Sequence, residues 1–318
     1  MKRTLYIVVP CYNEEEVLRE TASRLKAKMQ ALIERGVVSA ASRVLFVNDG
    51  SRDTTWQIIS ELHAGNILFN GVDLTRNCGH QQALIAGLMT AKEHADLVIS
   101  MDADLQDDID AVDEMVAKYA EGYDIVYGVR SARKKDTLFK RATAEFFYKL
   151  MTVMGVDIIF NHADYRLMSK RALDSFAEFK EVNLFLRGLV PLIGYRAAVV
   201  EYERGERFAG ESKYPLKKML AFAVEGITSF STCPLRLISY LGLVIFLISM
   251  LMLCYAVAQW LSGSTVTGWT SLICSVWAIG GLILLSIGIL GEYIGKIYLE
   301  TKARPRYLIR TILDHHDR

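Results

Sequence analysis

Up to about residue 130, short β-branched runs alternate with longer amphipathic segments. This alternation is typical of strand-helix units stacked in a mostly parallel sheet. The predicted strands are 4–9, 44–48, 67–74, 97–101 and 125–129. The helices predicted between them are 14–35, 53–64, 79–94 and 108–121. Polar residues follow each strand, and open α/β sheets bind ligands beyond the carboxyl ends of their strands. The five strand ends are therefore predicted to converge on one site.

The regular alternation fades between residues 131 and 235. The pattern there predicts helices and one strand at 137–155, 169–177, 183–193 and 196–202. A polar, glycine-containing stretch at 203–214 is predicted to be a loop. Residues 215–231 are amphipathic, with Lys217 and Lys218 beside apolar positions. Two interpretations of this segment stay open: a helix in a membrane interface, or a core helix of the soluble domain.

Two hydrophobic segments follow, at about 237–260 and 271–291, and no Asp, Glu, Lys or Arg occurs between Leu237 and Gly291. Each is close to the roughly 20 residues that span a bilayer. Basic residues flank the pair on both outer sides, so the positive-inside rule predicts both termini in the cytoplasm. We expect a multi-pass protein of the plasma (inner) membrane. The expected divisions are a cytosolic domain, an amphipathic segment, a two-helix membrane part and a basic cytosolic tail, at 1–214, 215–235, 236–294 and 295–318.

Charge and cysteine usage exclude several classes of protein. The chain has 37 Lys and Arg against 36 Asp and Glu, which argues against a nucleic-acid binder with a strongly basic face. The uncharged stretch argues against a purely soluble or disordered chain, and it is too short for a many-span transporter. Five scattered cysteines without a CxxC pair read as free thiols in a reducing compartment. The short apolar run near the N-terminus is not a signal peptide.

An acidic motif stands at the end of the fourth predicted strand. Asp102 and Asp104 lie two positions apart, with Gln106 and Asp107 just beyond. Oxygen ligands of this type suit Mg²⁺ or Mn²⁺ held partly by the phosphates of a substrate. The alternative is an acidic helix start in which Asp107 or Asp108 is the N-cap. Similar polar turns after the first and second strands favour the ligand-binding interpretation.

Taken together, the motifs resemble those of a known enzyme family. They are, in order, PCYNEE, VNDGSRDTT, LTRNCGHQQAL, MDADLQDD, YGVRSAR, DYRLMSKRAL, ERFAGESKYPLKKM and GEYIGKIYLETKARP. The chain resembles family-two glycosyltransferases of the GT-A fold that act on polyprenyl phosphates, a group that includes bactoprenol glucosyltransferases and dolichyl-phosphate mannose synthases. The resemblance implies an α/β fold: a cytosolic GT-A domain with a Rossmann-like, mostly parallel sheet, then an interfacial helix and two transmembrane helices.

The resemblance also implies roles on the donor side of the site. The residues that would hold the nucleoside of an activated sugar are Pro10, Tyr12, Asn13, Glu14 and Asp49. Arg76 and Asn77 would line the same pocket, Gly79 would let the backbone pass closely, and His80 would cap the next helix. Asp102 would contact the ribose or the sugar. Asp104 and Gln106 would hold the metal that neutralises the diphosphate leaving group.

On the acceptor side, a phosphate requires cations, and the basic segment 130–141 supplies them. Arg130 and Arg141 match the acceptor-phosphate arginines of the family, although a solvated basic loop is the alternative. Asp164 falls where inverting relatives place the candidate base, with Arg166 beside it. Asp164 instead orients the acceptor if the phosphate is already dianionic, or forms a buried structural salt bridge with Arg166. Three residues of the following loop would close over the diphosphate: Arg207, Ser212 and Lys213.

The implied reaction is transfer of glucose from UDP-glucose to undecaprenyl phosphate, with inversion, for glycosylation of the cell envelope. UDP-N-acetylglucosamine and GDP-mannose stay open as donors, and the oligomeric state is open, including a homo-oligomer. The expected partners are a nucleotide sugar, a polyprenyl phosphate and the lipid bilayer, without nucleic acid. A processive polysaccharide synthase is disfavoured because the chain lacks a QxxRW motif. A non-enzymatic membrane-anchored binding protein is disfavoured by the intact acidic motif.

Overall fold

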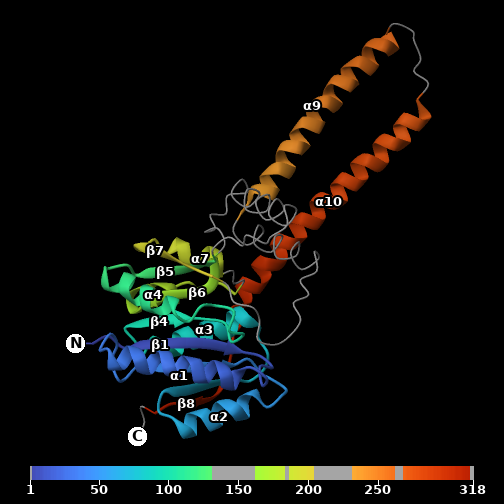
Figure 1. The fold of residues 1–318 in the computed structure, drawn as a ribbon. Helices are drawn as coiled ribbons and strands as arrows, with labels where there is room; N and C mark the ends of the chain where they lie inside the picture. The colour runs from blue at the N-terminus through green and yellow to red at the C-terminus, as the bar shows by residue number, and fades with distance from the viewer. Residues whose placement is uncertain (1, 131–161, 183–185, 204–230, 262–267, 316–318) are drawn as a thin grey trace. The chain divides into compact units, whose positions relative to one another are not determined.

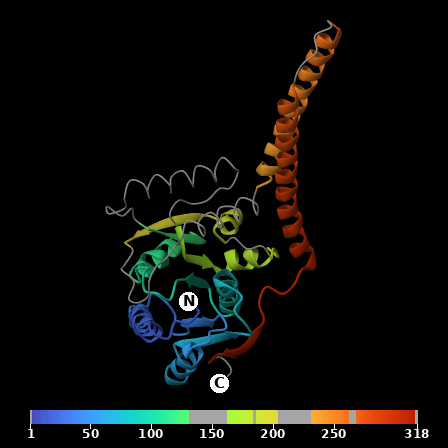
Figure 2. The same ribbon diagram turned by 90° about the vertical axis from the view of Figure 1, so that its right-hand side faces the viewer.

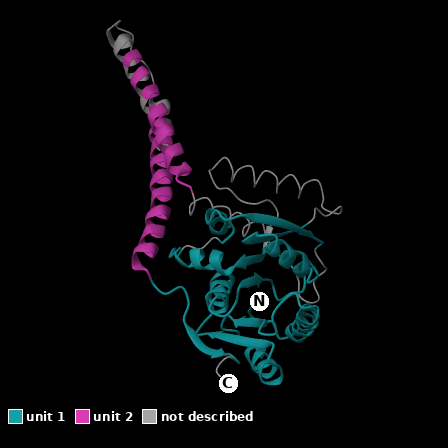
Figure 3. Cartoon of the chain, turned by 90° about the vertical axis from the view of Figure 1, so that its left-hand side faces the viewer, with its two compact units in different colours: residues 1–148, 157–215, 304–318 teal, residues 149–156, 216–303 magenta. Residues whose placement is uncertain are grey.

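In a computed structural model of the chain, the structure describes all residues except 1, 131–161, 183–185, 204–230, 262–267 and 316–318. The chain divides into two compact units, which Figure 3 colours separately. Unit 1 comprises residues 1–148, 157–215 and 304–318, and unit 2 comprises residues 149–156 and 216–303. The last residues of the chain therefore belong to the same unit as the first.

Unit 1 is built on an eight-stranded sheet with the order β7-β5-β6-β4-β1-β2-β3-β8 (Figure 1). Its strands are β1 Leu5–Cys11, β2 Arg43–Asn48, β3 Phe69–Leu74, β4 Leu97–Ser100, β5 Ile125–Arg130, β6 His162–Ser169, β7 Ala197–Tyr202 and β8 Ile309–Leu313. β1 pairs in parallel with β2 and β4, β2 pairs in parallel with β3, and β5 with β7. Among the described strands, β6 runs antiparallel to β4 and β5, and β8 runs antiparallel to β3, whereas the other pairs are parallel, so the expected mostly parallel sheet is confirmed.

Two strands were not predicted. β6 lies between β4 and β5 and runs against both. Its sequence, HADYRLMS, lacks the continuous apolar run that marks the other central strands. β8 lies within the expected basic tail and pairs with β3. Four of its five residues are exposed, because it is an edge strand, and this is why the hydrophobic pattern did not reveal it.

Helices cover both faces of the sheet, as Figure 2 shows. The helices of unit 1 are α1 Leu18–Glu34, α2 Thr55–Gly65, α3 His80–Ala91, α4 Ala111–Ala120, α6 Lys170–Ala177 and α7 Leu186–Leu192. α1 buries Leu18, Ala22, Leu25, Met29 and Leu32, a spacing that puts one apolar stripe against the sheet. α1, α2 and α4 share one core with Leu5, Ile7 and Val9 of β1, whereas α3 packs on the opposite face.

The face under α3 is packed so closely that it requires a glycine. A Cβ at Gly87 would lie 2.3 Å from Cγ1 of Val8 and 2.7 Å from Cγ2 of Val47. Such distances are far below van der Waals contact, so no larger residue fits without moving the helix. The close approach fixes the distance between α3 and the sheet. It therefore also fixes the position of the polar loop that precedes the helix.

Unit 2 contains two long helices, α9 Cys233–Leu261 and α10 Trp269–Lys302, which lie side by side (Figures 1 and 2). Among the described residues one helical stretch, Ala278–Lys302, is long and apolar enough to cross a membrane, with a mean hydropathy of 1.8. Cys233–Ile245 is apolar but shorter. Of the two expected spans, the described residues thus give one candidate. α10 also continues past the predicted end at residue 291 to Lys302.

Several expectations fall outside the described residues. These are the helix at 137–155, Arg141, the loop residues Arg207, Ser212 and Lys213, and all but the last residue of the amphipathic segment 215–231. The remaining predicted helices and strands of unit 1 are found within a few residues of their expected bounds.

Candidate active site

The predicted convergence of strand ends is found at the edge of the sheet that is formed by the carboxyl ends of the parallel strands. β1, β2, β3, β4 and β5 all run in one direction, so the loops after them share this edge. β6 runs the opposite way, and it therefore brings its first residues to the same edge. Asp164, the third residue of β6, thus lies beside loops from which it is far separated along the chain.

The loops after β1 and β2 are joined to each other. The side-chain oxygen of Asn13 accepts a bond of 2.9 Å from the amide of Arg52, and Oγ of Ser51 accepts one of 3.0 Å from the amide of Asn13. The amide of Glu14 donates to Oγ1 of Thr55 at 2.9 Å. Asn13 has φ 55°, a left-handed conformation that asparagine tolerates well.

The loop after β3 is joined to the same pair. Asp49 accepts backbone bonds of 2.7 Å from Cys78 and 3.0 Å from Gly79. A Cβ at Gly50 would lie 2.5 Å from the backbone of Arg76 and Asn77, so these loops touch. Among the expected nucleoside-contacting residues, Pro10 and Asp49 are buried and Glu14 is half-buried, whereas the others are exposed: Tyr12, Asn13, Arg76 and Asn77.

The acidic motif follows β4 as a tight turn. Asp104 accepts the amide of Gln106 at 3.2 Å, and Leu105 has φ 58°. The N-cap position of α4 is Asp110, so the alternative in which Asp107 or Asp108 caps the helix is wrong. Burial raises the pKa of Asp102 to about 6, although His80 opposes the shift.

The chemistry of this turn fits a divalent ion. The part of the chain that the structure describes holds no group of three or more His, Cys, Asp or Glu side chains able to form a complete metal site. Mg²⁺ and Mn²⁺ do not need one, since they are held by one or two protein oxygens together with substrate phosphates. Asp104 offers a carboxylate and Gln106 a buried amide oxygen in the same turn. The donor set therefore suits a metal that binds with a diphosphate.

Asp164 lies among three basic side chains. Oδ1 is 2.7 Å from Nη2 of Arg166, and Oδ2 is 3.6 Å from Nε2 of His80 and 3.7 Å from Nη2 of Arg187. Burial alone would raise the pKa of Asp164, but the contact with His80 and the charges of the two arginines outweigh it and lower the pKa. Asp164 is therefore a weak proton acceptor.

His80 connects this cluster to the acidic motif. Its Nε2 is also 3.6 Å from Oδ1 of Asp102, so one imidazole stands between two carboxylates. Burial lowers the pKa of His80, but Asp164 and Asp102 together raise it. The expected role of a simple helix cap misses this contact. A histidine directly after Gly79 at a predicted strand-to-helix turn was the available signal.

Arg187 was also missed, because α7 is separated from the site in sequence. The amide of Leu186 donates to Oε1 of Gln81 at 3.0 Å, and Arg166 donates to the carbonyl of Leu186 at 3.3 Å. These two bonds join α7 to α3 and β6. Nothing in the local sequence around Arg187 predicts this position.

Arg130, at the end of β5, lies on the same edge. Its side chain is partly exposed, and it contacts the buried carboxylate of Asp107 and the hydroxyl of Tyr202. Burial lowers the pKa of Arg130, but Tyr202, Asp107 and Asp102 outweigh it and raise the pKa. The expected acceptor arginine and the acidic motif are therefore electrostatic neighbours.

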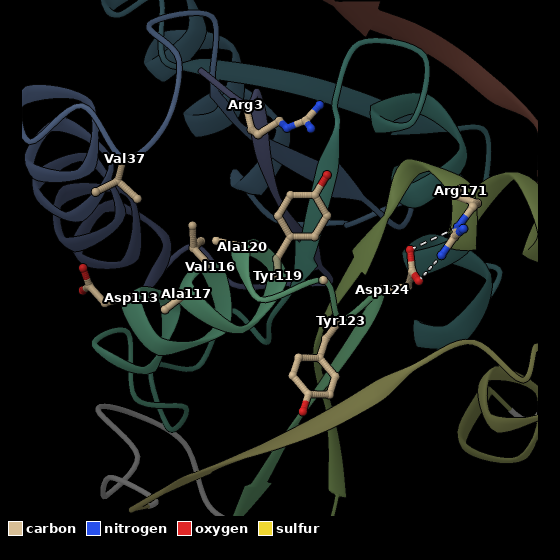
Figure 4. A pocket seen from close by; sticks show the side chains of 11 residues that line it. Arg3, Val37, Asp113, Val116, Ala117, Tyr119, Ala120, Tyr123, Asp124 and Arg171 are labelled. Carbon is tan, nitrogen blue, oxygen red and sulfur yellow. Dashed lines mark hydrogen bonds and ion pairs between the residues drawn. The ribbon is translucent and has the colours of Figure 1, made fainter. Parts of the chain in front are cut away.

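A separate cavity of about 710 Å³ lies at the other edge of the sheet (Figure 4). Arg3, two residues before β1, and Asp124, directly before β5, are among its lining residues, and Asp124 forms an ion pair with Arg171 there. None of the predicted site residues lines it. It is not the candidate active site.

Several known proteins are similar to this chain in sequence or fold. The model of Glycosyl transferase family 2 matches residues 6–176. The chain is 53% identical over 305 residues to YkoT, an uncharacterized glycosyltransferase of Bacillus subtilis, covering 96% of this chain and 90% of that protein. It is 41% identical over 312 residues to the bactoprenol glucosyl transferase of Shigella phage SfX, covering 96% and 98%. A solved mannosyl-3-phosphoglycerate synthase from Rubrobacter xylanophilus is 18% identical, with a TM-score of 0.46 over 76% of this chain and 75% of that one.

The family match begins in β1 and ends in α6, so it includes the acidic motif, Asp49, His80, Asp164 and Arg166, whereas Arg187 lies beyond it. The two relatives match nearly the whole chain, α9 and α10 included. The chain therefore belongs to glycosyl transferase family 2 and is a glycosyltransferase.

Proposed function

We propose that this glycosyltransferase transfers glucose from UDP-glucose to undecaprenyl phosphate at the cytoplasmic face of the plasma membrane. The observation that carries the proposal is the meeting of two kinds of group at one sheet edge: the acidic turn at Asp102 and Asp104, and the basic side chains of Arg130 and His80. Relatives named bactoprenol glucosyl transferase, similar over nearly the whole chain, support the lipid phosphate as acceptor.

On the donor side, Asp104 and Gln106 would hold Mg²⁺ or Mn²⁺, which when bound neutralises the charge that develops on the diphosphate leaving group. The loops after β1, β2 and β3 would hold the nucleoside through Tyr12, Asn13, Asp49 and Arg76. The bonds that join Asp49 to Cys78 and Gly79, and Asn13 to Ser51 and Arg52, support this role, because together they fix the three loops before substrate arrives.

On the acceptor side, Arg130 would bind the phosphate. A phosphate monoester is mostly dianionic at neutral pH and is itself the nucleophile, so it does not depend on a strong base. The lowered pKa of Asp164 supports an orienting role for that carboxylate. A single displacement at the anomeric carbon inverts its configuration, as the resemblance implies.

The membrane part has a matching purpose. A long-chain polyprenol stays in the bilayer, and the apolar stretch Ala278–Lys302 supports an anchor in the same phase. We place the catalytic unit and both termini in the cytoplasm, with α9 as a second span. The oligomeric state stays open in this proposal.

The full chain, purified in detergent and returned to vesicles, tests the proposal with a panel of nucleotide sugars and undecaprenyl phosphate. We expect metal-dependent release of UDP from UDP-glucose only when the lipid phosphate is present. Preference for UDP-N-acetylglucosamine or GDP-mannose would replace the donor and keep the reaction class. Binding of donor without any transfer would instead favour a non-enzymatic binding protein.

A further inference from the structure

We propose that Tyr202 and Asp107 are a positioning pair that presents Arg130 to the acceptor phosphate. The inference rests on the proposed function, since it assumes that Arg130 binds that phosphate. Neither residue touches substrate in this proposal. Both act through the guanidinium of Arg130.

The three side chains form one closed triangle of contacts. The hydroxyl of Tyr202 donates to Oδ1 of Asp107 at 2.5 Å. Nε of Arg130 donates to the same hydroxyl oxygen at 3.2 Å, and Nη2 of Arg130 lies 3.4 Å from Oδ1 of Asp107. The side chain of Asp107 is 1% exposed and that of Arg130 is 27% exposed. The guanidinium is thus held from its buried side and open on the other.

The way in which Tyr202, Asp107 and Arg130 share their hydrogen bonds matters for function. Burial raises the pKa of Tyr202, so its hydroxyl keeps its proton and remains a donor to Asp107. Oδ1 of the carboxylate accepts this bond, and its contact with Nη2 of Arg130 is longer, at 3.4 Å. A guanidinium has five N–H donors in a fixed plane, and the contacts within the described part of the chain engage Nε and Nη2. Donors remain for an incoming phosphate.

The pair also connects the acceptor arginine to the metal turn. Asp107 directly follows Gln106, and the hydroxyl of Tyr165 donates to the carbonyl of Asp108 at 2.9 Å. The rings of Tyr165 and Tyr202 pack edge to face with centroids 5.3 Å apart. One tyrosine from β6 and one from β7 thus fix this turn. Of these two tyrosines, Tyr202 is the one that also contacts Arg130.

The variant Tyr202→Phe removes one hydroxyl and keeps the ring packing. Asp107 then lacks its short bond, and a buried carboxylate takes the nearest donor, so Arg130 closes onto it. We expect the KM for undecaprenyl phosphate to rise roughly five- to tenfold, while the KM for the nucleotide sugar changes by less than about twofold. Tyr165→Phe is the matched control, because it removes a hydroxyl that bonds only the backbone of Asp108. Its acceptor KM should stay within about twofold of the parent value.

A double variant separates positioning from a merely structural role. In an Arg130→Ala background, Tyr202→Phe should raise the acceptor KM no further, because the tyrosine acts through the missing guanidinium. An equal rise in both backgrounds would overturn the proposal, as would an unchanged acceptor KM in the single variant. If Tyr202→Phe does not fold, Asp107→Asn provides the same comparison, since it keeps the side-chain shape and removes the charge opposite Arg130.

The parent chain distinguishes this inference from the proposed function. If the parent transfers no sugar to any lipid phosphate, the proposed function fails and the acceptor KM does not exist. If the parent transfers sugar and both single variants retain its acceptor KM, only the positioning pair is wrong. Thermal unfolding of every variant checks that the fold is retained.

Discussion

At the scale of single residues, the acidic turn at Asp104 and the cluster around Asp164 give different kinds of group to the site. Asp104 is half-buried in a turn and contributes little to packing. Arg166 is buried against the half-buried Asp164, so the arginine depends on its partner for charge compensation. Substitutions of Asp104 should therefore change the turnover of the enzyme, and substitutions of Asp164 should also change the stability of the fold.

Asp104→Ala is expected to remove divalent metal binding and to lower turnover by roughly a hundredfold or more, because the diphosphate charge is no longer neutralised. The fold should be retained. Titration with Mn²⁺ and steady-state turnover measure the two effects, and thermal unfolding checks the fold. Asp108→Asn is the control, since it changes an exposed carboxylate four positions away. Full activity of the Asp104 variant, or of the parent in EDTA, would refute the metal role.

His80→Gln tests the imidazole between Asp102 and Asp164. A raised folded-state pKa means that His80 stabilises the fold fully below its unfolded value of 6.5, and that this contribution is lost as pH rises through the raised pKa. The groups facing it are Asp102, Asp164 and Arg187. The parent should thus exceed the variant in unfolding temperature at about pH 6 and lose that advantage at about pH 9.

His80→Lys provides the comparison for that experiment, because its charge persists over the same pH range. Its difference from His80→Gln should stay nearly constant with pH. If the parent and the glutamine variant differ equally at both pH values, the ion pairs of His80 contribute no pH-dependent stability.

At the scale of elements, the position of α3 depends on packing against β1 and β2. Gly87→Ala should destabilise unit 1 by about 1–3 kcal/mol, since the new methyl group overlaps Val8 and Val47. Gly65→Ala, at the end of α2, is the control, because a Cβ there has nothing within 4 Å. Chemical unfolding of both variants measures the difference. Equal stability of the two would mean that α3 moves away from the sheet without cost.

At the scale of the whole molecule, unit 1 needs the last residues of the chain. β8 is the edge strand of the sheet beside β3, and Nη1 of Arg310 lies 3.2 Å from the buried carboxylate of Asp73. A chain that ends after Tyr214 would lose this strand together with α9 and α10. The role of unit 2 is better tested by replacing residues 216–303 with a flexible Gly/Ser linker, which retains β8.

That replacement is expected to keep nucleotide-sugar and metal binding, because the side chains proposed to bind them lie in the loops after β1 to β4, all within unit 1. Transfer to undecaprenyl phosphate in vesicles should fall strongly, and transfer to a short, water-soluble prenyl phosphate should fall less. Paired assays of the parent and the replaced chain with both acceptors measure this difference. Equal losses with the two acceptors would indicate that unit 2 does not serve to present the lipid.

The sequence by itself determined the parallel half of the sheet and the acidic turn. Strands β1 to β5 are short and mostly buried, and β-branched residues recur in all of them except β3. Helices such as α1 carry an apolar stripe at helical spacing, so local patterns were sufficient. The resemblance of the motifs also gave the family that the comparisons establish. These features depend on residues close together in the chain.

Only the tertiary structure decided which residues complete the site. Asp164 reaches the acidic turn because β6 runs antiparallel, and His80, Arg187 and Tyr202 come to the same edge from α3, α7 and β7. β8 joins β3 across most of the chain length. Such contacts are set by strand order and direction, which hydrophobic periodicity does not encode, because the same apolar pattern buries equally well in a parallel or an antiparallel position.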